Sequence, residues 1–139
     1  MLATAFVAAC GPPAGTLHKT TLTTPDGSYE MPVTLGDQTG LVVAMEQGDA
    51  EPLAASVPSV ATDPANPNVL VVSWMGGACE DETVVGFCPY EVGYGMYVAT
   101  RGGPGLGGGC PGIGIHRAIR LTLSSPVAAD QITFTNSGS

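Results

Sequence analysis

The fold is decided by the stretch Val69-Leu70-Val71-Val72-Ser73-Trp74-Met75. Successive side chains of a strand point to opposite faces, so Leu70, Val72 and Trp74 share one face. The opposite face is also largely apolar, which is typical of a strand with neighbours on both sides. The stretch therefore predicts a central strand, with Trp74 as a core residue rather than a ligand platform.

Composition limits what can surround this strand. The chain has 139 residues, which is the size of one domain, and 44% of them are hydrophobic. Its 20 glycines and 12 prolines leave little room for long helices. Four Lys and Arg residues against 12 Asp and Glu residues give a net charge of −8. This charge argues against nucleic acid or an anionic membrane surface as the main partner.

Further strands are predicted on both sides, because apolar runs alternate with turn signals such as Pro25-Asp26-Gly27-Ser28. Their expected ranges are 17–24, 29–35, 41–46, 83–87, 93–101, 115–123 and 132–135. Residues 47–68 contain four prolines and are predicted to be mostly a long connection, and residues 102–114 form a Gly-rich loop. The pattern predicts an all-β fold, a small Ig-like β-sandwich of about seven to eight strands over residues 17–136.

The range 115–123 has one apolar face, and a charged residue lies on it. Alternation places Ile115, Arg117, Ile119, Leu121 and Leu123 on that face. His116 and Arg120 fall on the opposite face. We therefore expect His116 to be exposed.

The N-terminus carries a motif of exported proteins. Val7-Ala8-Ala9-Cys10 resembles, in relaxed form, the lipobox that ends a bacterial lipoprotein signal peptide. The resemblance implies cleavage before Cys10 and lipid on its sulfur, which would anchor the protein at the outer face of a bacterial membrane. The alternative is a buried N-terminal strand with an incidental cysteine.

The organisation of the first 16 residues follows from this resemblance. No Lys or Arg precedes Lys19, whereas a signal peptide opens with basic residues. We interpret residues 1–9 as the remnant of a signal peptide whose start lies upstream. Residues 10–16 are then the lipidated cysteine and a flexible Gly- and Pro-rich tether.

Three cysteines remain if Cys10 carries lipid. Cysteines of exported proteins usually form disulfides. Cys79 follows the central strand and Cys110 precedes the range 115–123, so a bond between them would join the ends of neighbouring strands. This pairing is favoured, and Cys79–Cys88 is the main alternative. A metal site formed with His116 matches no compact ligand spacing.

A second resemblance covers about the last half of the chain. The pattern W-x-G-G-x-C over residues 74–79, a later Cys110, and R-x-x-x-L-x-L-x-x-P-V over residues 117–127 is similar to small exported bacterial lipoproteins. It implies a disulfide between the two pattern cysteines and a β-rich domain, but no activity. Cys88 is additional to the pattern.

Catalytic motifs are weak. Residues 103–108 formally match G-x-G-x-x-G, but the prolines and glycines that follow forbid the helix that a dinucleotide site needs. Glu80-Asp81-Glu82 could bind Ca²⁺ weakly, and a solvated loop is the favoured interpretation. The sequence predicts no catalytic residue, no cofactor and no metal.

The remaining candidate site is aromatic. Tyr90, Tyr94 and Tyr97 could form a ligand surface beside the Gly-rich loop, with packing in the core or at an edge as the alternative. The expected partner is an envelope protein, a peptide or a glycan. The leading hypothesis is a lipid-anchored binding or scaffolding module. The alternatives are a secreted hydrolase or metal-dependent redox enzyme, and a purely structural envelope protein.

Overall fold

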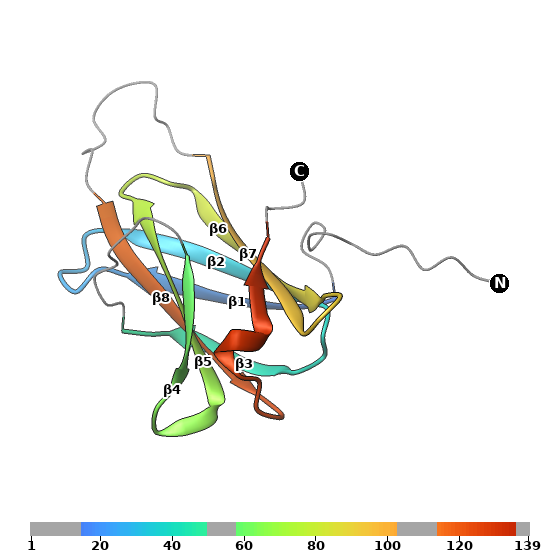
Figure 1. Cartoon of the computed structure of the whole chain (residues 1–139). Coiled ribbons are helices and arrows are strands. Elements are labelled where there is room, and N and C mark those ends of the chain that lie inside the picture. Colours follow the sequence, from blue (N-terminus) through green and yellow to red (C-terminus); the bar gives the residue numbers. More distant parts are fainter. Residues whose placement is uncertain (1–14, 50–57, 103–113, 136–139) are drawn as a thin grey trace.

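The computed structural model describes residues 15–49, 58–102 and 114–135, which form two β-sheets packed face to face (Figure 1). One sheet has the strand order β1-β2-β6-β7-β9, and the other has the order β3-β8-β5-β4. The strands are β1 (Thr16–Thr23), β2 (Glu30–Asp37), β3 (Val42–Gln47), β4 (Ser59–Asp63), β5 (Asn66–Gly77), β6 (Glu82–Pro89), β7 (Tyr94–Arg101), β8 (Gly114–Leu123) and β9 (Ile132–Phe134). The all-β sandwich is confirmed, with nine strands in the described ranges.

The predicted central strand is confirmed. β5 lies between β8 and β4 and pairs antiparallel with both. Its register places Trp74 opposite Arg117. Two other pairings are parallel, β2 with β6 and β7 with β9, and these join strands that are distant in the sequence.

β4 is the strand that the sequence pattern missed. It lies inside the Pro-rich range 47–68, which was expected to be mostly a connection, and it forms a hairpin with β5. Asp63 holds the turn, since its Oδ1 accepts a hydrogen bond of 2.8 Å from the backbone N–H of Ala65. β4 is a five-residue edge strand with no fully buried residue, so its period-two signal is weak.

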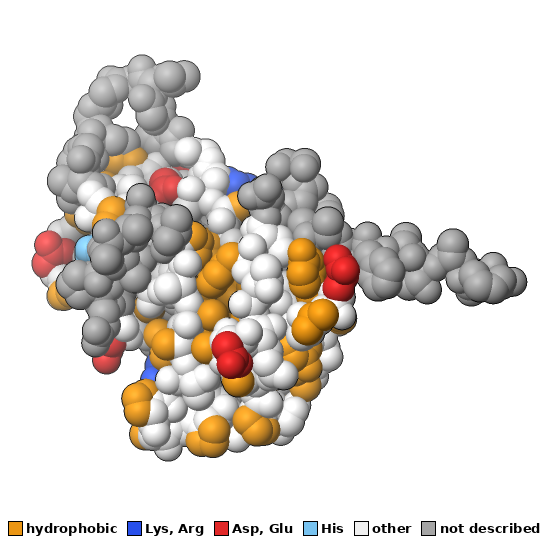
Figure 2. Space-filling view, in the orientation of Figure 1, with side chains coloured by type: hydrophobic (Ala, Val, Ile, Leu, Met, Phe, Trp, Pro, Cys, Tyr) orange, Lys and Arg blue, Asp and Glu red, His pale blue; other side chains and the backbone are white. Residues whose placement is uncertain are grey.

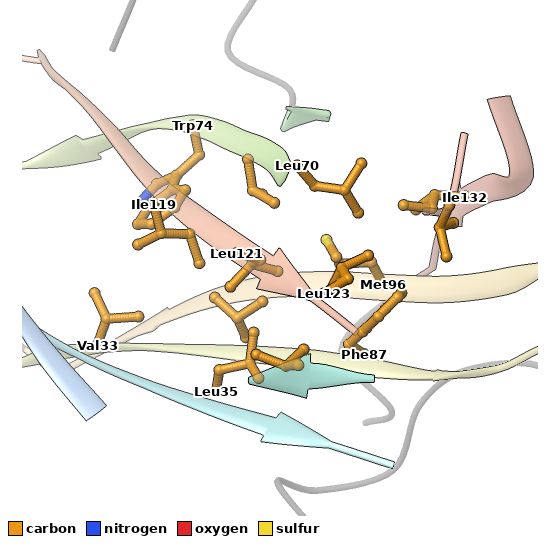
Figure 3. Close-up of a cluster of buried hydrophobic side chains, with 14 of the residues drawn as sticks. Val33, Leu35, Leu70, Trp74, Phe87, Met96, Ile119, Leu121, Leu123 and Ile132 are labelled. Carbon is orange, nitrogen blue, oxygen red and sulfur yellow. The ribbon is translucent and has the colours of Figure 1, made fainter. Parts of the chain in front are cut away.

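The core fills the space between the two sheets. Figure 3 shows side chains from both sheets facing one another there. The fully buried members of the core include Leu35, Phe87, Met96, Ile119 and Leu121. Burying each large apolar side chain contributes about 1.5–3 kcal/mol. Trp74 is also a core residue, with an exposed fraction of 2%.

The only helical segment in the described ranges is the single turn η1 (Ala129–Gln131). It precedes β9, whose Ile132 and Phe134 pack on the core as expected. Within these ranges, no helix has the length and apolar character needed to cross a bilayer.

Candidate functional site

The three tyrosines do not form one surface. Tyr97 has an exposed fraction of 3% and packs with Val84 and Cys88 in a small cluster on the outer face of its sheet. Its ring covers Gly86, where an added Cβ would overlap the ring atoms. Tyr97 therefore offers no side-chain area to a ligand, and the expectation that it lines a surface is wrong.

Tyr94 lies on the opposite face of the same strand. Its ring packs against the core, with a centroid 5.4 Å from that of Phe87 and an angle of 39° between the planes. A separation of three residues reverses the face on a strand, so the spacing between Tyr94 and Tyr97 already carried this information. Tyr90 lies half-buried in the turn between β6 and β7 and lines an open cavity.

The two described cysteines are both disulfide-bonded. They are not bonded to each other, because β6 separates them: Glu82 and Cys88 are about 20 Å apart along the strand. Cys79 precedes Glu82 by three residues, which reach at most about 11 Å, so its Cα stays about 9 Å from that of Cys88. A disulfide requires the two Cα atoms to lie within about 7 Å of each other. The alternative pairing Cys79–Cys88 is therefore wrong.

Three predictions from the sequence concern residues that the structure does not describe. Cys10, Cys110 and the Gly-rich range 103–113 lie outside the described ranges. Lipidation at Cys10 and the pairing Cys79–Cys110 remain predictions.

The acidic residues after β5 do not converge on one point. An oxygen of Glu80 accepts a hydrogen bond from the backbone N–H of Gly77, whereas Glu82 lies 3.9 Å from Arg101 in an exposed ion pair. Among the described residues, no group of three His, Cys, Asp or Glu side chains could hold a metal ion. Figure 2 shows acidic side chains scattered over the visible face rather than gathered in a patch.

The most unusual side chain is Arg117. Alternation along β8 turns it toward the core, in line with Ile119 and Leu121, and leaves it with an exposed fraction of 3%. Its Nε and Nη2 atoms are buried and have no hydrogen-bond partner. Burial lowers the pKa of the Arg117 guanidinium from its usual value, and the nearby charge of Glu80 opposes this shift.

The other two arginines are paired. Arg120 binds Asp63 at 2.8 Å and lies 3.7 Å from Glu46, and Arg101 is paired with Glu82. No ion pair within the described ranges includes Arg117. An ion taken out of water costs several kcal/mol unless it is paired and hydrogen-bonded. Arg117 is thus a buried cation that forms no ion pair in this part of the chain, and Glu80 is the acid whose charge acts on it.

Arg117 lines a cavity of about 190 Å³ at the edge of the sandwich. Thr23 and Thr24 at the end of β1 form one wall, and Gln47 and Asp49 at the end of β3 form another. The amide of Gln47 closes this edge by bonding the backbone of Thr23 twice, at 3.0 and 2.9 Å. The cavity therefore lies where the two sheets meet through their edge strands.

Buried donors without partners gather at this end of the core. Trp74 lies opposite Arg117 in the register, and its Nε1 atom is also buried without a hydrogen-bond partner. Indole and guanidinium nitrogens donate and never accept. His116 also lines the cavity and is half-buried with an unpartnered Nδ1, so the expectation that it is exposed is wrong.

The sequence contained one signal of this site. An arginine on the apolar face of the range 115–123 is a charge at a core position, and such a position requires a partner. Nothing in the sequence pointed to Gln47, which lies 70 residues away from Arg117 along the chain. Comparison with protein-family models, with curated proteins and with solved structures finds no match for this chain.

Proposed function

We propose that the protein is an exported β-sandwich domain, held by lipid on Cys10 at the outer face of a bacterial membrane. It acts as a binding or scaffolding module of the cell envelope rather than as an enzyme. The lipobox resemblance at residues 7–10 supports the anchor. The disulfide-bonded state of Cys79 and Cys88 supports an oxidising compartment. The partner is an envelope protein, a peptide or a glycan.

One observation carries the binding role, namely the unpartnered guanidinium of Arg117 beside a cavity. A buried arginine of this kind destabilises the fold when nothing neutralises it. Replacement by an apolar residue of similar size is often neutral or stabilising. An arginine that is unfavourable for folding and lies against a cavity fits a side chain kept for binding.

The anchor is tested by fractionation of the protein expressed in a bacterial host from its own gene, including in-frame sequence upstream of Met1. We expect the wild-type protein in the membrane fraction and the Cys10→Ser variant in the soluble fraction. Cys88→Ser is the matched control, since it removes a cysteine without touching the lipobox, and it should stay in the membrane fraction. A wild-type protein found only in the soluble fraction would contradict the anchor.

The disulfide of Cys88 provides a second test, because the sulfur of Cys10 can form either a lipid thioether or a disulfide, but not both. The chain has four cysteines and Cys79 is out of reach of Cys88, which leaves Cys10, Cys110 or a thiol of another molecule as the partner. A lipid thioether on Cys10 removes the first of these, and a Cys79–Cys110 disulfide removes the second. The two proposals together therefore require Cys88 to bond a thiol of another molecule. Mass spectrometry of the unreduced protein decides: a lipid-bearing Cys10 peptide supports the anchor, and a Cys10–Cys88 peptide overturns it.

A further inference from the structure

We propose that the cavity between the β6–β7 turn and η1 binds a basic side chain, a lysine or an arginine, of a partner protein or peptide. This inference rests on the proposed binding function and names the chemistry of the partner. The cavity has a volume of about 480 Å³ and is lined by the turn residues from Tyr90 to Gly93 and by Asp130, Gln131 and Thr133. Sites for small ligands usually have volumes of about 300–1,000 Å³, so this cavity is large enough for one long side chain.

This cavity is separate from the cavity beside Arg117. Thr23, in the wall of the Arg117 cavity, pairs with Glu30 at the start of β2. Asp37, at the end of β2, pairs with Phe87 near the end of β6, and the β6–β7 turn follows β6 directly. The two cavities therefore lie at opposite ends of β2.

Backbone contacts hold the two walls of the cavity in place. Gly93 has a φ of 77°, and a Cβ atom there would lie 2.3 Å from the carbonyl oxygen of Gln131. The turn and η1 thus touch at a position that only glycine allows (Figure 1). The N–H of Tyr90 donates a hydrogen bond of 3.2 Å to the carbonyl oxygen of Gly93 and closes the turn.

The wall formed by η1 is held by Gln131. Its side-chain oxygen accepts a hydrogen bond of 3.1 Å from the N–H of Ala128, and its own N–H donates one of 2.9 Å to the carbonyl oxygen of Ala128. Asp130 is therefore carried by a turn that is fixed on both sides. Side chains on a preorganised backbone bind a ligand at a lower cost in conformational entropy.

Charge selects a cation. The cavity is lined by the two exposed carboxylates of Glu91 and Asp130, and none of its described lining residues is Lys, Arg or His. Neither carboxylate forms an ion pair with another described residue. The net charge of −8 adds to the attraction of a cation and repels an anionic ligand. Since no three described His, Cys, Asp or Glu side chains could hold a metal ion, an organic cation is favoured.

The remaining walls suit the aliphatic part of a basic side chain. Among the described residues, Val92 is the most exposed large hydrophobic residue, with an exposed fraction of 84%, and it lies in the cavity wall. The methylene groups of lysine and arginine cover apolar surface while the charged end stays polar. The aromatic ring of Tyr90 forms another wall, and such rings attract cations at close range.

The main experiment is a ¹H–¹⁵N NMR titration of the full-length chain with blocked peptides. The first peptide is Ala-Ala-Lys-Ala-Ala, acetylated at its N-terminus and amidated at its C-terminus. The second has norleucine in place of lysine, which keeps the aliphatic chain and removes the ammonium group. We expect the lysine peptide to shift the backbone signal of Gly93 and to leave that of Gly48, in the wall of the Arg117 cavity, in place. The norleucine peptide should shift the Gly93 signal much less at the same concentration.

A third peptide, with arginine in place of lysine, identifies the basic side chain. If it binds more tightly than the lysine peptide, the partner inserts an arginine. If it binds more weakly, the partner inserts a lysine. Both results support a cationic ligand, because the norleucine peptide serves as the uncharged reference for each of them.

Variants test the two carboxylates. Glu91→Gln and Asp130→Asn remove the charges and keep the shape of the side chains. The double variant should weaken binding of the lysine peptide about two- to thirtyfold, the range that two exposed ion pairs predict. The matched control is Glu30→Gln with Asp81→Asn, which removes the same charge at two other exposed positions and should leave the affinity unchanged. Because all four side chains are exposed, none of these substitutions should prevent folding.

The proposal is overturned if the lysine and norleucine peptides shift the Gly93 signal equally, if neither shifts it, or if the double variant binds the lysine peptide as wild type does. A chitin oligosaccharide that shifts this signal when the lysine peptide does not would assign the cavity to a glycan and also overturn it. Such results leave the proposed function standing if Cys10 is lipidated and the protein fractionates with the membrane. Conversely, binding of the lysine peptide by a protein found only in the soluble fraction would retain the site and remove the anchor.

Discussion

The side-chain amide of Gln47 and the backbone of Thr23 pair as two strands would. Oε1 of Gln47 accepts a hydrogen bond of 3.0 Å from the N–H of Thr23, and Nε2 donates one of 2.9 Å to its carbonyl oxygen. Thr23 ends β1 of one sheet and Gln47 ends β3 of the other. One side chain thus joins the edge strands of the two sheets, and it does so in the wall of the Arg117 cavity.

Removal of the Gln47 amide should weaken the contact between the edge strands β1 and β3. A net contribution of about 0.5–1.5 kcal/mol per hydrogen bond predicts that Gln47→Ala lowers the free energy of unfolding by about 1–2 kcal/mol. Gln47→Glu should cost a similar amount, because a carboxylate cannot donate to the carbonyl of Thr23. Gln38→Ala, at another exposed glutamine, is the control in urea titrations. Equal urea midpoints for the wild type and all three variants would show that the Gln47 amide contributes nothing to stability.

The carboxylate of Asp37 should contribute more to the free energy of unfolding than the amide of Gln47, because Asp37 is buried. Its exposed fraction is 2%, and its carboxylate accepts hydrogen bonds from the N–H and hydroxyl of Thr39 and from the N–H of Val42. Asp37→Ala leaves these donors unpaired between β2 and β3. We expect a loss of about 3 kcal/mol in the free energy of unfolding, measured by chemical denaturation. The exposed Asp81→Ala is the control, and an equal loss there would assign the effect to charge alone.

The variants Tyr97→Ala and Tyr90→Ala should differ in melting temperature. Deleting a fully buried aromatic ring typically costs about 3–5 kcal/mol, so Tyr97→Ala should lower the melting temperature strongly. Tyr90→Ala, in a half-buried turn, should lower it much less. Thermal unfolding followed by circular dichroism measures both. Similar small losses for the two variants would mean that Tyr97 is not packed as described.

Acid should weaken the turn before β2. Hydrogen bonds from the Thr24 hydroxyl and the backbone N–H of Ser28 lower the pKa of Asp26 from 3.8 to about 2. The unfolded chain therefore binds this proton more tightly than the folded one. The stabilisation is fully present above pH 3.8 and is lost as the pH falls through about 2.

Asp26→Asn removes this titration. The difference in melting temperature between wild type and Asp26→Asn should therefore narrow as the pH is lowered from 5 to 2, a range of about three units. Asp130→Asn makes the same charge change on the exposed turn η1 and serves as the control. A difference that stays constant with pH would contradict the lowered pKa of Asp26.

Unreduced peptide mapping should find Cys79 linked to Cys110. β5 and β8 pair as far as Gly77 and Gly114, so the chain segments that carry the two cysteines start from the same end of one strand pair. A loop of about 31 residues closed in this way stabilises by about 3–4 kcal/mol on the chain-entropy model. Recovery of Cys79 bonded to any other cysteine would contradict this pairing.

The sequence by itself determined the strands and their faces. Side-chain alternation is a local property of the chain, so it can be read wherever one face is apolar. All eight predicted strands coincide with observed strands, and the inward faces of β5 and β8 are as predicted. The short edge strand β4 was not predicted, because an edge strand buries too little of either face to show the alternation of apolar and polar residues.

Only the tertiary structure decided which side chains meet. The burial of Tyr97 depends on the glycine opposite it on β6, and the bond between Gln47 and Thr23 depends on how the two sheets close. The sequence placed Arg117 on an apolar face, but it could not show that Nε and Nη2 lack partners. A residue's partners come from strands distant along the chain, and their arrangement is fixed by packing rather than by local period.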